Sequence, residues 1–579
     1  MRPRRFFLHT LSILFILFPC VLQAQTIPPP PIEWGEIPRA DLEMTSYPKD
    51  SSASAVVLCD YGETKLQDNF NLKYTRHLRV KILNEKGFRW GTMSISVDPD
   101  RENGDYVDEI EGVTYVLDPQ GKVKEFELDE DDIFEEEVSQ NVRRHKFTLP
   151  GLTPGCVVEI RISIISKSLF GIRGWVFQDD DPVLMSEYRL IHPSAIVFAV
   201  LTRGYEKMSA YDHFETKMHY SGDVASYYGN RIVDCRFWRW VMKDIPAMRT
   251  EPYITTVSDY TSRIDLQLSG YAMRGGGVQR VISTWEQFVE DLMKEKNFGK
   301  VLADPGDAED VAKALTDTIR SPYERMKAIH RYVSSTITWN GRNTMWATQK
   351  AEDLLESKKG SSADINYLLV VMLRAAGIQA DPMILSTRSN GQTQELYPIL
   401  GQFNYGVARA VVGGTVYPLD ATNPLRPFDL LPAGLLGVRA YIVDPQQAVW
   451  TTITSPLRGI STVVATMNIQ ADGAVRGSIN GLYKNYFSHL HRSNLSGSTP
   501  EAMAKQLFSL NASGLTLDSV EVVNKDSGAL PFILKASVSS EAYAQNAGDL
   551  LYINPHMISR YDENPFKNPI RKFPVDYNY

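Results

Sequence analysis

The stretch Lys359-Gly-Ser-Ser-Ala-Asp-Ile-Asn-Tyr-Leu-Leu-Val-Val-Met-Leu-Arg-Ala-Ala-Gly377 decides the fold of the central part of this chain. From Ile365 onward its apolar residues recur at positions i, i+3, i+4, i+7 and i+8, as on one face of a helix. Ser362 is a candidate N-cap, Asp364 suits the positive end of the helix dipole, and Gly377 is a candidate C-cap. The pattern predicts a helix over residues 363–376.

Strand-like stretches follow this helix, and further helices precede it. Residues 381–387, 405–412 and 415–419 have the composition of strands, and Gly413-Gly414 between the last two is a hairpin signal. Ser321-Pro322 is typical of a helix start with proline at the first helical position, and Ser283 with Glu286 forms a candidate capping box. We predict an α+β domain over residues 275–450, with its helices first and its sheet second.

Three motifs of this domain resemble those of a known family. Gly360-Ser-Ser362 opens the helix, Phe403-Asn-Tyr405 opens the next strand, and Leu419-Asp-Ala-Thr422 closes the hairpin. They resemble Gly-x-Cys, Phe-Asn-His or Phe-Asn-Tyr, and Leu-Asp-Ala-Thr of secreted transglutaminase-like proteins, members of the papain-type superfamily from Gram-negative envelopes. The resemblance covers residues 45–579. It includes that family's N-terminal domain of unknown function, matched at 146–150, 155–159, 175–178 and Glu251-Pro-Tyr253.

The resemblance implies a catalytic triad whose chemistry this chain has lost. The nucleophile position falls on Ser362, or on Ser361 if the register is off by one, the base position on Tyr405, and the acid position on Asp420. A serine needs a base to attack, and a tyrosine with a pKa of about 10 is a poor base at neutral pH. No histidine lies between His330 and His489. We therefore expect a degenerate triad and no catalytic residues.

Several functions stay open at this point. The first is a non-catalytic scaffold that binds a peptide, protein or glycan of the cell envelope in a degenerate cleft. The alternative is a hydrolase or acyltransferase of altered chemistry, in which Ser362 acts with a base from elsewhere, such as His330 or a partner chain. A purely structural envelope component is the third. Structural roles also compete for single residues, since Asp420 suits a turn.

Two β domains are predicted on either side of the central domain. Apolar and polar residues alternate in 73–83 and 159–165, as in half-buried strands, so we predict an antiparallel β-sandwich-like domain over residues 51–250. The acidic run 129–137 within it is typical of a solvated loop. Alternation returns in 463–469 and 532–538, which predicts a C-terminal β domain over 455–579. That domain is incomplete if the last stretch, 573–579, begins a further strand. The fold class is multidomain α+β.

The first 24 residues have the pattern of a signal peptide. Arg2, Arg4 and Arg5 precede an apolar run that is too short to span a membrane comfortably, and Gln23-Ala24-Gln25 follows it. Residues 25–50, which include Pro28-Pro-Pro-Pro31, are expected to form an extended leader. We expect an exported protein of the periplasm or cell surface of a Gram-negative bacterium. We expect no transmembrane helix in the mature chain.

Composition narrows the possible partners. The net charge is −8 and we find no basic cluster after the N-terminus, so we expect no nucleic acid partner. Cys59, Cys156 and Cys235 remain after cleavage, an odd count without the pattern of a disulfide framework. His489-x-His491, expected on a strand, lacks an obvious third ligand. We therefore expect no metal site, no cofactor-binding residues and no cofactor.

Overall fold

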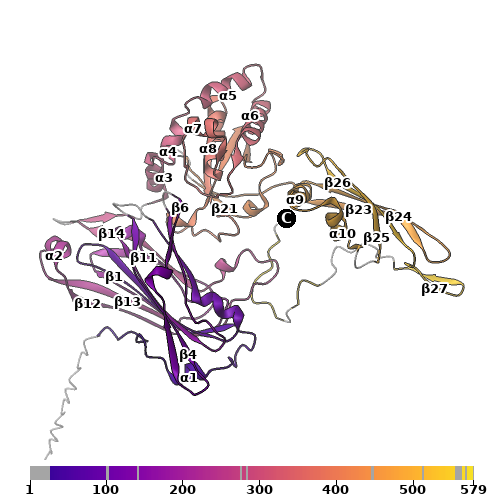
Figure 1. Ribbon diagram of the computed structural model, residues 1–579. Helices are drawn as coiled ribbons and strands as arrows, with labels where there is room; N and C mark the ends of the chain where they lie inside the picture. Colours follow the sequence, from indigo (N-terminus) through magenta and orange to yellow (C-terminus); the bar gives the residue numbers. More distant parts are fainter. Residues whose placement is uncertain are drawn as a thin grey trace, which may run out of the picture. The chain divides into compact units, whose positions relative to one another are not determined.

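The computed structural model describes residues 26–98, 104–139, 142–273, 277–281, 284–444, 449–510, 514–554, 564–567 and 570–577. The predicted signal peptide (1–24), Ser283 and Tyr579 lie outside these residues. The chain divides into two compact units, each described by itself. The first holds most of the chain up to Pro246, and the second holds 178–180, 197–206 and everything from Ala247 onward. Figure 1 shows sheets and helices along the chain, which confirms the multidomain α+β class.

The first unit is built on an eight-stranded sheet with the strand order β12-β13-β10-β1-β2-β8-β4-β5. In this sheet β1 and β10 run parallel, whereas the sequence predicted antiparallel strands throughout. The strands are β1 (Ala55–Leu66), β2 (Leu72–Ile82), β4 (Asp105–Leu117), β5 (Val123–Glu127), β8 (Val157–Ser166), β10 (Val183–Pro193), β12 (Ala210–His219) and β13 (Ile232–Ile245). The unit also contains β9 (Trp175–Val176) and the helices α1 (Arg39–Glu43) and α2 (Gly222–Tyr228).

A three-stranded sheet accompanies it, in the order β3-β7-β6: β3 (Thr92–Val97), β7 (Val142–Thr148) and β6 (Phe134–Ser139). The predicted solvated loop over 129–137 is wrong for residues 134–137, because these belong to β6. Glu135 and Glu136 pair across the sheet with Arg143 and Lys146, at 3.2 and 2.5 Å. Opposite charges facing each other on neighbouring strands stabilise a sheet.

The leader covers the polar face of the large sheet, so β2 and β8 are not the half-buried strands that the alternation predicted. The buried guanidinium of Arg189 donates hydrogen bonds to the carbonyl oxygens of Pro28 and Pro29, both at 2.7 Å. Lys81, also buried, donates from Nζ to the carbonyl oxygens of Leu42 and Gly155, both at 2.6 Å. A buried cation is costly unless its donors are satisfied. The leader supplies three of these four carbonyl acceptors, and Gly155 supplies the fourth.

Buried acids balance the buried cations on this face. Glu187 is fully buried and accepts hydrogen bonds from Nε of Arg189 at 2.7 Å and from Nε and Nη2 of Arg239 at 2.9 and 2.8 Å. Arg239 also reaches Asp212, whose side chain is 47% exposed, at 2.8 Å. One arginine therefore joins a buried acid to an exposed one.

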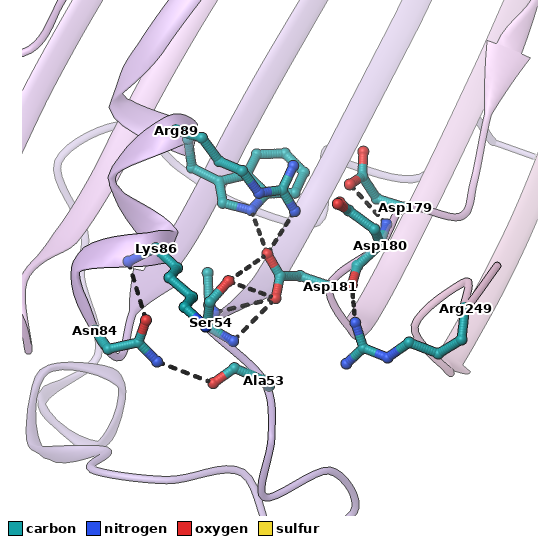
Figure 2. A network of polar contacts seen from close by, with 11 residues as sticks. Ala53, Ser54, Asn84, Lys86, Arg89, Asp179, Asp180, Asp181 and Arg249 are labelled. Carbon is teal, nitrogen blue, oxygen red and sulfur yellow. Dashed lines mark hydrogen bonds and ion pairs between the residues drawn. The ribbon is translucent and has the colours of Figure 1, made fainter. Parts of the chain in front are cut away.

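A second carboxylate ties loops to the start of β1 (Figure 2). Oδ1 of Asp181 accepts hydrogen bonds from the backbone N–H and the hydroxyl of Ser54, at 3.1 and 3.0 Å. Its Oδ2 accepts from Nη2 of Arg89 at 2.5 Å and from Nε1 of Trp90 at 2.9 Å. Because charge-assisted hydrogen bonds are the strong ones, Asp181 fixes the entry of β1 against the turn that carries Arg89 and Trp90.

The α+β domain of the second unit forms around α8 (Ser362–Ala375), which matches the predicted helix to within one residue at each end. Its sheet has the order β20-β19-β18-β21-β22. The strands are β18 (Gln379–Leu385), β19 (Tyr405–Val412), β20 (Thr415–Leu419), β21 (Arg439–Ile442) and β22 (Trp450–Thr452). The other elements are α3 (Trp285–Lys294), α4 (Gly299–Ala303), α5 (Ala308–Thr316), α6 (Pro322–Thr336), α7 (Ala351–Ser357), β16 (Thr338–Trp339) and β17 (Lys359–Gly360).

Local signals account for these elements. Ser321 caps α6 with Pro322 at its start, and Gly413 and Gly414 turn the β19–β20 hairpin with φ of +58° and +80°. The cap of α3 is Thr284, which accepts from the N–H of Gln287 at 3.3 Å. Every residue of α8 from Ser362 to Leu373 is buried, so this helix is the centre of the domain core.

The C-terminal part holds a sheet in the order β23-β24-β26-β25, namely β23 (Ile460–Ile469), β24 (Val475–Lys484), β26 (Phe532–Ser540) and β25 (Thr516–Val523). With it lie α9 (Tyr486–Leu495), α10 (Pro500–Leu507), β27 (Gln545–Ala547) and β28 (Leu550–Tyr552). The second unit also contains β11 (Ile196–Arg203), β14 (Arg263–Ala272) and β15 (Val278–Arg280). Residues 570–577 form no strand, contrary to the strand expected from residue 573.

Candidate functional site

The N-terminus of α8 is closed by a capping box. Ser361, not Ser362, is the N-cap: its hydroxyl accepts from the backbone N–H of Asp364 at 3.2 Å, and Oδ2 of Asp364 accepts from the N–H of Ser361 at 2.8 Å. Asp364 also accepts from the backbone N–H and the hydroxyl of Thr348, at 2.6 and 2.7 Å. Some of the N–H groups that would otherwise bind an anion at this helix end are therefore hydrogen-bonded to the side chains of Ser361 and Asp364.

Ser362, the predicted nucleophile position, is the first residue of α8 and has 0% exposed surface. Its hydroxyl donates to the carbonyl oxygen of Thr344 and accepts from the N–H of Thr344, both at 3.1 Å. Because both the donor and an acceptor lone pair are used by one backbone unit, the hydroxyl fastens the segment around Thr344 to the start of the helix. It makes no described hydrogen bond to Tyr405 or Asp420.

The other two triad-equivalent positions do come together. Tyr405 is the first residue of β19 and Asp420 follows β20, so the hairpin brings them side by side. The hydroxyl of Tyr405 donates to Oδ2 of Asp420 at 2.7 Å, and both residues are buried. Burial, followed by the charge of Asp420, raises the pKa of Tyr405 well above its usual range. Tyr405 is therefore a proton donor to the acid and not a base.

Asn366 and Arg426 complete the surroundings of Asp420, and neither was predicted from the sequence. Asn366, one turn after Ser362 on α8, donates from Nδ2 to Oδ2 of Asp420 at 2.9 Å and to the carbonyl of Gly406 at 2.8 Å. Its Oδ1 accepts from the N–H of Ala421 at 3.0 Å. An amide in the middle of an otherwise apolar helix was the signal for a buried polar partner, because buried polar groups are hydrogen-bonded.

The remaining donors to Asp420 include a buried cation. Oδ1 accepts from the N–H and the hydroxyl of Thr422, at 3.1 and 2.6 Å, and is paired with Nη2 of Arg426. Burial alone would raise the pKa of Asp420, but Arg426 together with hydrogen bonds from Thr422, Asn366 and Tyr405 lowers it below its usual 3.8. The acid is thus a charged, internally neutralised group that joins α8 to the hairpin.

His330, the candidate base from elsewhere, lies on α6 and is buried. Its Nε2 donates to the backbone carbonyl of Asp420 at 2.9 Å. Burial, which outweighs the effect of that hydrogen bond, lowers the pKa of His330. None of its described hydrogen bonds involves Ser362.

A cavity of about 600 Å³ opens elsewhere on the same domain. It is lined by Tyr417, Arg409, Phe428 and Ile442 among others, and its lining contains none of Ser362, Tyr405 and Asp420. Pockets that bind ligands combine apolar walls with a few polar groups, as this one does. The cavity and the triad-equivalent positions are therefore separate features.

The structure corrects the expectation for His489-x-His491, because both residues lie on the helix α9 and not on a strand. Burial lowers the pKa of each to about 4. Within the described residues, no group of three or more His, Cys, Asp and Glu side chains is placed to hold a metal ion. Cys59, Cys156 and Cys235 are buried free thiols. None of the described helices has the length and apolar content to cross a membrane.

Comparison with known families assigns the central domain. Residues 309–407, which include α8 and the start of β19, match the transglutaminase-like superfamily. The central domain is transglutaminase-like. Residues 68–249 match a domain of unknown function, DUF3857. Both parts of the predicted resemblance are thereby confirmed, whereas the loss of the triad's chemistry stays a prediction. No curated protein sequence matches the chain.

Among solved structures, a "putative protease" from Parabacteroides distasonis matches 84% of this chain and 93% of its own, at a TM-score of 0.50 and 12% identity. At that identity the likeness shows the fold alone. A "putative cysteine protease" from Cytophaga hutchinsonii matches 41% of this chain and 75% of its own, at a TM-score of 0.18 and 11% identity. An M1 zinc metallopeptidase from Deinococcus radiodurans matches 38% of this chain and 44% of its own, at a TM-score of 0.17 and 12% identity. Scores as low as the last two establish no shared fold.

Proposed function

We propose that this chain is an exported, non-catalytic transglutaminase-like protein that serves the cell envelope as a scaffold binding a peptide or glycan. One observation carries the non-catalytic part of the proposal. The hydroxyl of Ser362 is buried and hydrogen-bonded to the backbone of Thr344 on both its donor and its acceptor side. A serine in that state has no base to take its proton, and an activated nucleophile requires one.

The neighbouring groups support the same conclusion. The hydroxyl of Tyr405 donates a hydrogen bond to Asp420, and Nε2 of His330 donates one to the backbone carbonyl of Asp420. A general base should titrate near the working pH and lie within hydrogen-bond reach of the proton that it removes. The transglutaminase-like fold is present, but its polar groups are hydrogen-bonded to one another. This favours a role in binding. The ligand class rests on the resemblance to envelope proteins.

The first experiment is a screen for amidase, transglutaminase and protease activity with the intact protein and its Ser362→Ala variant. We expect no turnover that depends on Ser362. Turnover that disappears in Ser362→Ala would instead establish the alternative, a hydrolase or acyltransferase of altered chemistry. The same two proteins, tested against peptidoglycan fragments and envelope peptides, should bind a ligand equally well, because the hydroxyl of Ser362 faces the protein interior.

The second experiment tests the assignment of the triad-equivalent positions. The double variant Ser362→Cys/Tyr405→His places a thiol and an imidazole where the resemblance expects them. We expect a thiol with a lower pKa than in Ser362→Cys alone, measured from the pH dependence of its alkylation rate, because a nearby imidazolium and the helix N-terminus stabilise a thiolate. A thiol of equal pKa in both variants would show that the two positions are not partners.

Export is tested by cell fractionation. The proposal requires a mature protein in the periplasmic or surface fraction whose N-terminal sequence begins after Ala24, as the predicted cleavage near that residue implies. A full-length chain in the cytoplasmic fraction would contradict export without affecting the assignment of the domain.

A further inference from the structure

Residues 570–577, Ile-Arg-Lys-Phe-Pro-Val-Asp-Tyr, lie against a part of the second unit that is some 320 residues earlier in the chain. We call residues 570–577 the C-segment and residues 248–260 the docking strip. The C-segment contains no helix or strand. Its attachment rests on three kinds of contact: to its backbone, to one aromatic side chain and to one acidic side chain.

The backbone contact centres on Glu251, a buried acid of the Glu251-Pro-Tyr253 motif. Its Oε1 accepts from the N–H of Lys572 at 2.8 Å, and its Oε2 accepts from the N–H of Phe573 at 3.2 Å. The guanidinium of Arg571 donates to the carbonyl of Pro252 at 2.8 Å and lies 3.5 Å from Glu251 Oε2. A carboxylate that accepts two successive N–H groups recognises an extended backbone whatever side chains it bears.

The aromatic contact is Phe573, which is 8% exposed and packs in a small apolar cluster with Met248 and Tyr260. Its ring stacks on that of Tyr260 with centroids 4.5 Å apart. Tyr205 extends the contact at 6.2 Å. Burying an aromatic ring in such a pocket supplies a large apolar gain to a short peptide.

The acidic contact lies three residues further on. The N–H of Asp576 donates to the carbonyl of Tyr253 at 2.7 Å, and its carboxylate pairs with Nη2 of Arg388 at 2.9 Å. The side chain of Arg388 is almost fully buried at the edge of a cavity of about 290 Å³. The docking strip with Arg388 thus presents an acid, an apolar pocket and a base in the order that complements Arg571, Phe573 and Asp576.

We infer that the docking strip with Arg388 is a recognition site for a linear peptide, and that the C-segment occupies it in this chain. The partner that it fits is an extended segment of another protein with a basic residue, an aromatic residue two positions later and an acidic residue three positions after that. Recognition of backbone groups plus spaced side-chain anchors is the general mode of peptide capture. This site contains none of Ser362, Tyr405 and Asp420, so the inference does not depend on the proposed function.

Tethering decides how such a site behaves. A segment held on the same chain competes at an effective concentration of about 1 mM, so a foreign peptide with equal contacts binds weakly while the C-segment is in place. Weakening the C-segment must then strengthen binding of a peptide added in trans.

The experiment uses the full chain and a fluorescent peptide with the sequence of residues 570–577. We expect the variant Phe573→Ser/Asp576→Asn to bind the peptide at least about ten-fold more tightly than the wild type, because its own segment no longer competes. Val575→Ser, at a position that is 43% exposed, is the matched control and should bind as weakly as the wild type. Adding Glu251→Gln to the double variant should weaken binding about ten-fold or more through loss of the charged acceptor.

Equal binding by wild type and double variant, or binding unaffected by Glu251→Gln, would overturn the inference. If the double variant does not fold, Asp576→Asn alone replaces it, because that side chain is 38% exposed and its loss should still strengthen peptide binding. No binding to a folded variant also overturns the proposal. Sedimentation of the wild type supplies the last outcome. A dimer that dissociates when the peptide is added would show that the C-segment of a second copy occupies the site. That result would contradict a partner from another protein.

Discussion

Replacing Asp420 by asparagine tests whether this acid has a structural role. The side chain keeps its shape but loses its charge, and one of its two oxygens becomes a donor. In the protein those oxygens accept from Tyr405 and Asn366 on one side and from Thr422 and Arg426 on the other. Whichever way the amide turns, its NH₂ group faces two donors, and the buried guanidinium of Arg426 loses its counter-charge.

The expected cost follows from that geometry. Removing one partner of a buried ion pair destabilises a protein by about 3–5 kcal/mol, and we take about 3 because the amide retains one acceptor. Since 1.4 kcal/mol is a factor of ten, the opening equilibrium of α8 and β19 should rise about 100-fold. The side chains of Asp420 and Arg426 are 0% and 5% exposed, so solvent screening does not reduce this figure.

Hydrogen exchange resolved to peptides is the suitable assay, because a chain of several domains does not unfold in two states and a global free energy of unfolding would be ill-defined. The amides of α8 and β19 should exchange faster in Asp420→Asn while those of the first unit are unchanged. Asp429→Asn, at an exposed acid nine residues on, is the matched control. If both variants changed the protection of α8 by less than about 1 kcal/mol, a typical surface effect, the structural role of Asp420 would be refuted.

Two further predictions concern buried charge. Because the pKa of Asp420 is lowered from 3.8, its contribution to stability is present above that pH and is lost as the pH falls through the depressed value. The difference in α8 protection between wild type and Asp420→Asn should therefore stay constant from pH 7 to about 4 and shrink below pH 4. A difference that vanished near pH 6 would contradict the assignment. In the first unit, Glu187→Gln should destabilise the β domain by about 3–5 kcal/mol and Asp212→Asn by less than about 1, although both acids bind Arg239, because only Glu187 is buried. Hydrogen exchange of the amides of β10 and β13 checks this, and equal changes for the two variants would show that burial is not the cause.

The sequence predicted the central domain well because its signals are local. The apolar period of α8, the Ser321-Pro322 start of α6 and the glycine pair of the β19–β20 hairpin each lie within one element. The helix α9 was missed because the spacing of His489 and His491 fits a strand, and three residues cannot distinguish the two periods. The strand β6 was missed because the acidic run, taken alone, does not show the basic residues of β7 that pair with it.

The polar centre of the domain was only half predictable, for a related reason. The motifs placed Tyr405 and Asp420 side by side, as the hairpin requires. Asn366 and Arg426 were not foreseen, because their roles depend on which face of α8 meets the hairpin and on how the chain after Thr422 turns back. The leader shows the same limit: its prolines predicted an extended segment, but the cation that they satisfy, Arg189, is 160 residues away.

Retention of Asp420 is therefore weak evidence for catalysis. A catalytic acid and a structural acid both need burial and donors, and this one has a full set of donors without any histidine. Its removal would leave Arg426 unpaired, which alone is enough to explain why a domain without the chemistry would keep it. Ser362 discriminates better between the two roles, because a nucleophile must be free to give up its proton and a fastening residue must not. Its two hydrogen bonds to Thr344 are those of a fastening residue.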